Sequence, residues 1–145
     1  MAIVCKYIEP PTDTAQATEF IRDVVAPLIA KYWEKEERDI CGKDLSFSVV
    51  PFIQMWLLDS LMIVVAYEDD VPIGIVLGTK FVPMFYQAKV LQIEAAYGPV
   101  STIMDYILTI IGFMGITEIR SFPGWMPKNM WPMIRTRQIA TYVKK

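Results

Sequence analysis

The side chains that most often carry out catalysis are sparse in this chain of 145 residues. Histidine is absent, which excludes Ser-His-Asp and Cys-His nucleophile systems, a histidine general base and histidine-bound metals. Cys5 and Cys41 lack the spacing of a zinc site or a disulfide framework, so we expect two reduced thiols and no metal. Carboxylates, hydroxyls and backbone groups remain, and their use depends on the elements that position them.

The apolar pattern predicts a single α/β domain over residues 1–145, long enough to bury a core without disulfides. We expect a helix capped by Thr12 or Thr14 and kinked at Pro27, and a short helix before the final strand. The other expected elements are strands over 3–8, 61–67, 73–78, 88–97, 117–122 and 135–143 and helices over 46–58 and 101–114, with a polar turn at 68–70. This order predicts a mixed, mostly antiparallel sheet flanked by helices.

The composition is apolar, with 54% hydrophobic residues and a mean hydropathy of +0.34. The longest apolar stretch, 45–67, contains Asp59, which costs about 3 kcal/mol at a bilayer centre, so we expect no membrane span. The N-terminal residues hold no basic segment followed by a long apolar run, so we expect no signal peptide. The apolar helix over 101–114 predicts burial on two sides, against the sheet and against a partner.

Charge divides the chain into two unequal parts. Residues 1–119 hold 8 basic and 16 acidic side chains, whereas residues 120–145 hold six basic side chains and no acidic one. The net charge of −2 lacks the basic excess of a nucleic-acid binder, so we expect no nucleic-acid partner. The basic, aromatic segment 120–145 is either a partner-binding element or an internal complement to the acidic part. If it binds a partner, we expect these side chains to do so: Trp125, Trp131, Arg135 and Arg137.

Three segments together resemble the GNAT (GCN5-related N-acetyltransferase) fold. VVAYEDDVPIGIVLG at 64–78 is similar to the second and third strands of the family, and LQIEAAYG at 91–98 to its fourth strand. GFMGITEIRSF at 112–122 is similar to the end of the central helix and the fifth strand. Gly124-Trp125 and TYVKK at 141–145 resemble phage-encoded GNAT-like proteins.

The resemblance implies an acyl-CoA site between the fourth strand and the central helix, where GNAT enzymes carry a glycine-rich loop for the diphosphate. Here the corresponding stretch, 97–105, has one glycine, no basic residue, Pro99 and Asp105, so the loop is degraded. If coenzyme A does bind, we expect these residues to hold it: Ala96, Tyr97, Gly98, Ser101 and Thr102.

In many GNAT enzymes the fourth strand also carries a carboxylate base, and Glu94 occupies that strand here. The alternative is that Glu94 points outward and pairs with Lys89 or Arg120. The general-acid tyrosine that the family places after the fifth strand has no counterpart in this chain.

Three functions follow from these observations. The first is a virion-associated structural or interaction component. It uses no cofactor and binds other protein subunits in a homo-oligomer or a larger assembly. The second is an acetyl-CoA-dependent N-acyltransferase with Glu94 as base. The third is a small inhibitor of a host enzyme. The expected location is the host cytoplasm or the assembled virion.

Overall fold

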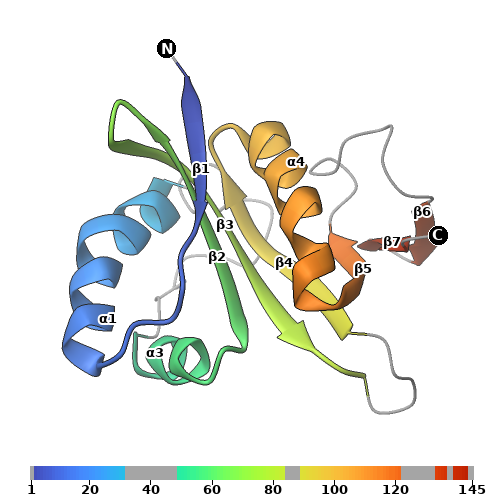
Figure 1. Ribbon diagram of the computed structural model, residues 1–145, viewed down its shortest axis with the longest axis horizontal. Coiled ribbons are helices and arrows are strands. Elements are labelled where there is room, and N and C mark those ends of the chain that lie inside the picture. The colour runs from blue at the N-terminus through green and yellow to red at the C-terminus, as the bar shows by residue number, and fades with distance from the viewer. Residues whose placement is uncertain (1, 32–48, 84–88, 122–132, 137–138, 144–145) are drawn as a thin grey trace.

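The computed structural model describes residues 2–31, 49–83, 89–121, 133–136 and 139–143. Its centre is a seven-stranded sheet in the order β1-β2-β3-β4-β5-β7-β6, in which only β4 and β5 are parallel (Figure 1). The strands are β1 Ile3–Tyr7, β2 Leu61–Glu68, β3 Val71–Phe81, β4 Lys89–Tyr97, β5 Ile116–Ser121, β6 Met133–Thr136 and β7 Ile139–Val143. The helices are α1 Thr14–Phe20, the π-helical η1 Ile21–Val25, α3 Val49–Leu57, α4 Val100–Ile110 and the 3-10 helix η2 Ile111–Met114. The sequence prediction of a mixed, mostly antiparallel sheet flanked by helices is confirmed.

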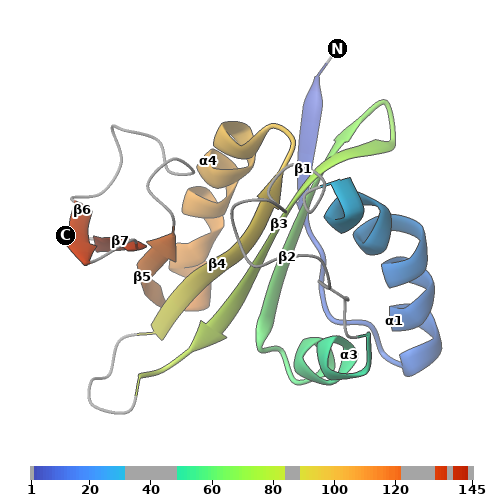
Figure 2. The ribbon, with the colours of Figure 1, turned by 180° about the vertical axis from the view of Figure 1, so that it is seen from behind.

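Helices cover both faces of the sheet (Figures 1 and 2). On one face α4 packs over a core that includes Met62, Val64 and Leu91. On the other face α1 and α3 pack over a core that includes Ile63 and Val65. Residues 61–66 of β2 are therefore all buried, which explains why this segment reads as a continuous apolar run rather than an alternating one.

The β2–β3 hairpin closes on two acidic residues in the left-handed region. Asp69 and Asp70 have φ of 51° and 66°. Two positive φ angles at the centre of a two-residue turn are typical of type I′, whose twist matches that of the flanking strands. The polar turn that the sequence predicted is confirmed, and β3 begins at Val71, earlier than expected.

The first helical segment begins at a different cap from the one predicted. Asp13, not Thr12 or Thr14, is the N-cap, and its Oδ1 accepts a 2.8 Å hydrogen bond from the Gln16 N–H. The helix changes to π geometry over Ile21–Val25, just before Pro27, and continues as α-helix over 26–31. The expected irregularity at Pro27 therefore takes the form of a π turn on its N-terminal side.

The helix over 101–114 is buried against the sheet on one side, as predicted, and the side that the sequence analysis assigned to a partner is exposed in the single chain. Ile103, Met104 and Ile107 of α4 are fully buried on the sheet. Asp105 and Thr109 are exposed, and Phe113 of η2 is 93% exposed. The segment is amphipathic, with its apolar stripe on one face. It ends at Gly115, whose φ of 73° supplies the left-handed C-cap.

The final predicted strand over 135–143 is two strands. β6 pairs with β7, and β7 pairs with β5, so the C-terminal hairpin extends the sheet. Part of segment 120–145 therefore belongs to the fold. The expected short helix falls outside the described residues. Within the described ranges, no helix is long and apolar enough to cross a bilayer.

Candidate functional site

The two parallel strands of the sheet separate after a few residues and leave a fork. β4 pairs with β5 only from Lys89↔Ile116 to Gln92↔Arg120, although β4 continues to Tyr97 beside β3. Figure 2 shows β4 running on beside β3 while β5 leads toward β7. Residues 93–97 of β4 therefore have β3 on one edge and no strand partner on the other among the described residues. We call this unpaired edge of β4 the fork edge.

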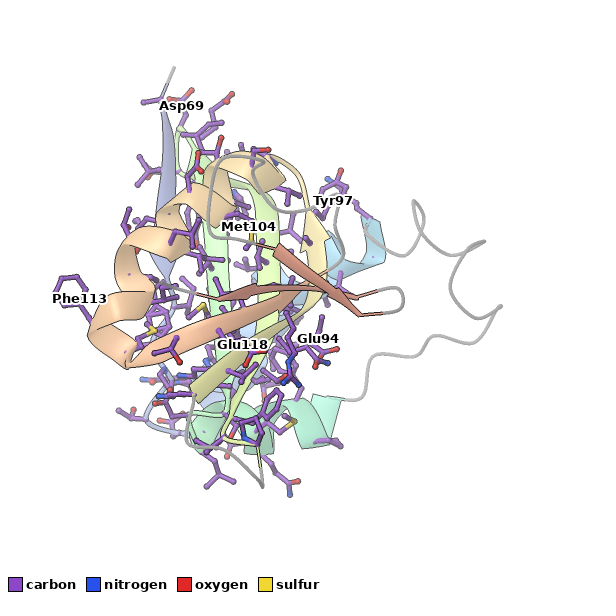
Figure 3. All side chains as sticks on the ribbon, turned by 90° about the vertical axis from the view of Figure 1, so that its right-hand side faces the viewer. Asp69, Glu94, Tyr97, Met104, Phe113 and Glu118 are labelled. Atoms are coloured by element: carbon purple, nitrogen blue, oxygen red, sulfur yellow. The ribbon has the colours of Figure 1, made fainter. Side chains whose placement is uncertain are left out.

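Glu94 lies in a β-bulge at the start of the fork edge. Leu77 of β3 pairs with Ala95 and the next residue, Gly78, pairs with Ile93, so Glu94 is the extra residue in β4. A bulge bends its strand and re-aims one side chain. Glu94 is exposed, and Figure 3 labels its side chain.

Two neutral donors hold the Glu94 carboxylate. Its Oε1 accepts hydrogen bonds from the Thr79 hydroxyl at 3.1 Å and from the Gln92 Nε2 at 2.9 Å. Oε2 has no bonded partner in the part of the chain that the structure describes. Among the described residues the carboxylate therefore keeps one oxygen without a bonded partner, and such an oxygen can accept a hydrogen bond from a cation or a proton from an amine.

The alternative pairing of Glu94 with Lys89 or Arg120 is wrong. Lys89 donates instead to the Met114 carbonyl at 3.1 Å. Arg120 pairs with Glu118 at 3.2 Å, and its guanidinium lies 5.7 Å from the centre of the Phe81 ring.

Sequence reasoning missed the neighbours of Glu94, although one of them carries a usable signal. Gln92 is two residues from Glu94 along the same strand, a spacing that places two side chains on one face. Thr79 joins the group only through the β3–β4 register, where it lies opposite Gln92.

The turn from β4 into α4 is compact, and one of its backbone N–H groups is already bonded to a carbonyl within the turn. Pro99 is the N-cap with φ −77° and ψ 70°, the inverse γ-turn conformation, and the Val100 N–H donates to the Gly98 carbonyl at 2.8 Å. The Ile103 N–H donates to the Pro99 carbonyl at 3.0 Å, which begins the helix. Of the first α4 amides, those of Ser101 and Thr102 are left without a bonded partner among the described residues.

The single glycine of this turn is needed for packing. A Cβ on Gly98, whose φ is +92°, would lie 2.6 Å from the Gly74 Cα and from the Ile73 carbonyl oxygen. A Cβ on Gly74 would lie 2.6 Å from the Pro99 Cδ. The turn is therefore pressed against β3 at two facing glycines.

The structure describes all five residues that were expected to hold coenzyme A, but only one of the four that were expected to bind a partner. Ala96 is buried in the α4 core and Tyr97 is half-buried, whereas Gly98, Ser101 and Thr102 are exposed. Asp105 is also exposed, four residues after Ser101 and so on the same helix face. Arg135 lies in β6. Trp125, Trp131 and Arg137 fall outside the described residues.

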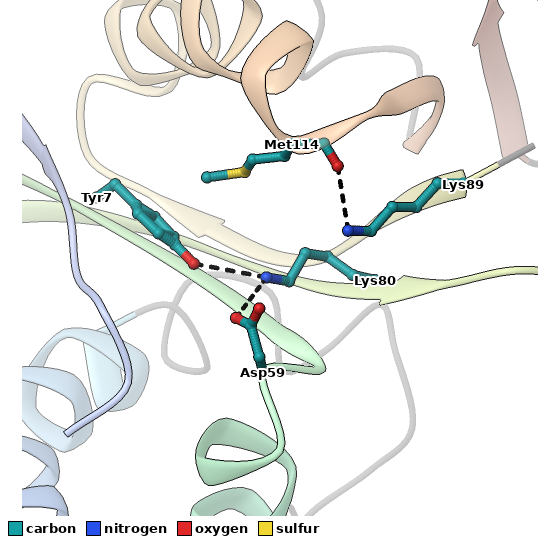
Figure 4. Close-up of polar contacts among 5 residues, drawn as sticks. All are labelled: Tyr7, Asp59, Lys80, Lys89 and Met114. Carbon is teal, nitrogen blue, oxygen red and sulfur yellow. Dashed lines mark hydrogen bonds and ion pairs between the residues drawn. The ribbon is translucent and has the colours of Figure 1, made fainter. Parts of the chain in front are cut away.

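A second polar cluster lies between α3, the sheet and η2 (Figure 4). The Lys80 ammonium is buried and donates to Asp59 Oδ1 at 2.7 Å and to the Tyr7 hydroxyl at 3.5 Å. Burial raises the pKa of Tyr7, an effect that nearby Lys80 opposes. These contacts join β1, β3 and the α3–β2 corner, so the cluster holds elements together. Among the described residues no group of acidic and thiol side chains is arranged to hold a metal ion.

Comparisons with known proteins identify the fold but no sequence relative. No model of a protein family matches the chain, and no curated protein matches it. Among solved structures, a ribosomal-protein-alanine N-acetyltransferase from Brucella melitensis is similar over 89% of this chain and 83% of its own, with a TM-score of 0.57 and 13% identity. The PaiA N-acetyltransferase of Thermoplasma acidophilum, in complex with coenzyme A, is similar over 99% of this chain and 100% of its own, with a TM-score of 0.54 and 12% identity.

A third similar structure is an aminoglycoside acetyltransferase from an uncultured soil metagenomic sample, in complex with sisomicin. It covers 82% of this chain and 76% of its own, with a TM-score of 0.56 and 9% identity. The chain therefore has the GNAT-like α/β fold, and the fold expected from the sequence resemblance is confirmed.

Proposed function

We propose that this chain uses its GNAT-like fold to bind other protein subunits, as an interaction component of a phage particle, and does not transfer acyl groups from coenzyme A. The observation that carries the proposal is the turn before α4. The residues there do not fit a diphosphate well, for three physical reasons.

The first reason is the loss of donors. Backbone N–H groups at a helix N-terminus bind phosphate because they point outward together. Pro99 has no N–H, and the Val100 N–H is bonded to Gly98. Two amides of the first turn remain, those of Ser101 and Thr102.

The second reason is packing. Gly98 and Gly74 are in contact, so the glycine is used for the close approach of turn and strand.

The third reason is charge. Asp105 shares a helix face with Ser101, and a carboxylate about 6 Å along the helix axis repels a phosphate bound there. Together these features remove attraction and add repulsion at the place where the diphosphate would bind.

Two sequence features support the role in a particle. Gly124-Trp125 and the stretch 141–145 resemble phage-encoded GNAT-like proteins, and the high mean hydropathy favours extra buried interface. Phe113 and Leu58 are 93% and 78% exposed, so both apolar side chains are accessible to a partner.

Calorimetric titration of the full chain with acetyl-CoA tests the loss of the cofactor site. We expect no binding tighter than about 1 mM, which corresponds to about 4 kcal/mol. The double variant Pro99→Gly/Asp105→Asn restores an N–H and removes the carboxylate, so it should bind at least about tenfold more tightly. Asp23→Asn, on η1, is the matched control and should change nothing. Micromolar binding by the unmodified chain would contradict the proposal.

The structural role needs a separate measurement. Sedimentation of the purified chain and mass spectrometry of purified phage particles should show a stable oligomer or the chain in stoichiometric amount. A concentration-independent monomer that is missing from the particles would contradict this part.

The second candidate function is N-acyl transfer, and Glu94 is the observation that favours it. Its Oε2, which has no bonded partner among the described residues, could accept a proton from an attacking amine. If acetyl-CoA does bind, Glu94→Gln should abolish acyl transfer while leaving cofactor affinity unchanged. The inhibitor function has no observation of its own in the structure.

A further inference from the structure

We infer that the outer edge of β1 pairs with the same edge of a second copy of this chain, in an antiparallel register centred on Val4. The inference names a surface and a partner for the subunit binding proposed above, and it rests on that function only in this respect. The two sheets join across a two-fold axis, so that the same residues contribute from both sides.

The outer edge of β1 is open and apolar. β1 is the first strand of the sheet and has β2 on one side only, and it lies between α1 and α4 in Figure 1. Val4 is 51% exposed and Ile3 is 36% exposed. The stretch from Ile3 to Cys5 contains neither a charge nor a proline. Such an edge is a template for pairing with another strand.

Backbone hydrogen bonds show which residues of β1 face outward. The Ile8 N–H donates to the Ile63 carbonyl of β2 at 2.9 Å. Alternate residues of a strand direct both N–H and C=O to the same edge. The even-numbered residues of β1 therefore face β2, whereas Ile3, Cys5 and Tyr7 direct their polar backbone groups outward.

One of the three outward residues is already engaged. The Tyr7 N–H donates to the Tyr106 hydroxyl of α4 at 3.2 Å, so an added strand cannot bond it. The outward groups of Ile3 and Cys5 have no bonded partner in the part of the chain that the structure describes. An incoming strand therefore meets two free residues beside a blocked one.

This pattern selects one register. Two copies of β1 pair their free residues with each other when Ile3 of each copy lies opposite Cys5 of the other. Val4 then faces Val4 at the two-fold axis, in a non-hydrogen-bonded pair whose side chains lie close together and cover each other. A register centred on Cys5 would instead place Ile3 opposite Tyr7, whose N–H is bonded to Tyr106.

The same register is favourable for charge. It places Lys6 opposite Ala2 of the second copy, and Ala2 lies next to the β2–β3 turn because Ile3 pairs with the last residue of β2. That turn carries Asp69 and Asp70, both exposed. Two strand spacings, about 10 Å, separate Lys6 from the turn, which is about one Debye length at 0.1 M salt. This attraction occurs twice in the dimer and favours a second copy over an unrelated strand.

Disulfide cross-linking of the full-length chain tests the register. In a Cys5→Ser/Cys41→Ser background, Val4→Cys brings two thiols to facing positions, within the Cα separation of about 4.4–6.8 Å that a disulfide needs. Lys6→Cys is the matched control, because its two Cα atoms are about 14 Å apart in this register. We expect Val4→Cys to form a covalent dimer at least about tenfold faster than Lys6→Cys under mild oxidation.

Sedimentation equilibrium tests the energetics without a cross-link. Val4→Glu places like charges opposite each other and should weaken dimerisation at least about tenfold. Val82→Glu is the matched control, since Val82 is 61% exposed just after β3, and it should leave dimerisation unchanged. Asp69→Asn/Asp70→Asn keeps residues that tolerate positive φ, and it should weaken the dimer and reduce its dependence on salt.

The outcomes separate this inference from the proposed function. Equally fast cross-linking of Lys6→Cys and Val4→Cys, or a monomer at every concentration, would overturn the inference. An oligomer that survives Val4→Glu leaves subunit binding in place and overturns only the β1 interface. A β1 dimer that binds acetyl-CoA at micromolar concentration upholds the interface and contradicts the loss of the cofactor site.

Discussion

The Lys80 ammonium lies 2.7 Å from Asp59 Oδ1, and the two side chains differ sharply in exposure, 4% for Lys80 and 61% for Asp59. The buried cation therefore depends on a partner that is itself largely in water. Asp59 also has a φ of 57°, which a non-glycine residue adopts at some cost, so the ion pair holds a strained corner between α3 and β2.

Removal of the acidic partner should destabilise the fold. Asp59→Asn retains a residue that tolerates positive φ but leaves the ammonium with the Tyr7 hydroxyl at 3.5 Å. We expect a loss of about 1–2 kcal/mol, less than for a fully buried pair because Asp59 is exposed. Urea unfolding measures the loss. Lys80→Met, which removes the charge and keeps the volume, should cost less than Asp59→Asn, and a larger cost would contradict this account.

Stability should fall at alkaline pH. Burial raises the pKa of Tyr7, of Tyr67 and of Cys5 in the folded chain. Each group therefore holds its proton more tightly when folded, so its contribution is complete below the unfolded pKa and is lost as pH rises through the folded pKa. For the two tyrosines the decline begins near pH 10.

The measurement is the urea midpoint at a series of pH values from neutral to alkaline. Tyr67→Phe should flatten the decline, and Tyr7→Phe/Tyr67→Phe should flatten it further. An identical slope in the double variant would assign the decline to other groups.

The stability cost of replacing a glycine by alanine should depend on its φ angle and on the space around it. Gly98→Ala combines a positive φ with two contacts of 2.6 Å and should cost at least about 2 kcal/mol. Gly115→Ala has the positive φ but open space, so it should cost about 1 kcal/mol. Gly112→Ala has open space and no positive φ, so it should be neutral or slightly stabilising. Thermal unfolding of the three variants gives the order, and an equal cost for Gly98 and Gly112 would refute the close packing of the β4–α4 turn.

Replacement of two apolar residues, Met104 of α4 and Phe113 of η2, should change the stability of the fold by very different amounts. Met104→Ala empties a fully buried site and should cost about 2–5 kcal/mol. Phe113→Ser changes a side chain that is 93% exposed, so the stability of the isolated chain should change by less than about 0.5 kcal/mol. Sedimentation then measures the self-association of both variants. If Phe113 serves an interface, its replacement should weaken self-association or partner binding without loss of fold.

The sequence predicted most of the fold because its elements have strong local signals. The two aspartates at 69–70 mark the hairpin turn, and the apolar run 61–67 marks a strand buried on both faces. The final hairpin was missed because residues 135–139 contain neither glycine nor proline, so nothing in the pattern separates β6 from β7. The predicted start of β3 was too late because Pro72 was read as lying outside the strand. In the structure this proline is tolerated, because it pairs with Tyr67 beside the register shift between Ala66 and Tyr67.

The candidate site was less accessible from the sequence. The position of Glu94 in the fourth strand was predicted, but its partners were not, because they depend on the register of β3 against β4. The bulge that makes Glu94 an extra residue depends on pairing and has no signature in this sequence. The bonded Val100 amide likewise results from the backbone angles of Pro99, which residue types alone do not specify.

The strand order at the C-terminal side of the sheet constrains how the protein is made. β6 precedes β7 in the sequence, yet β7 lies between β5 and β6. On a ribosome β6 emerges first and finds no strand to join until β7 has followed it. The sheet beyond β5 is thus completed in reverse of the order of translation, and a nascent chain stalled before residue 139 would carry an uncovered β5 edge open to a chaperone or a neighbouring chain.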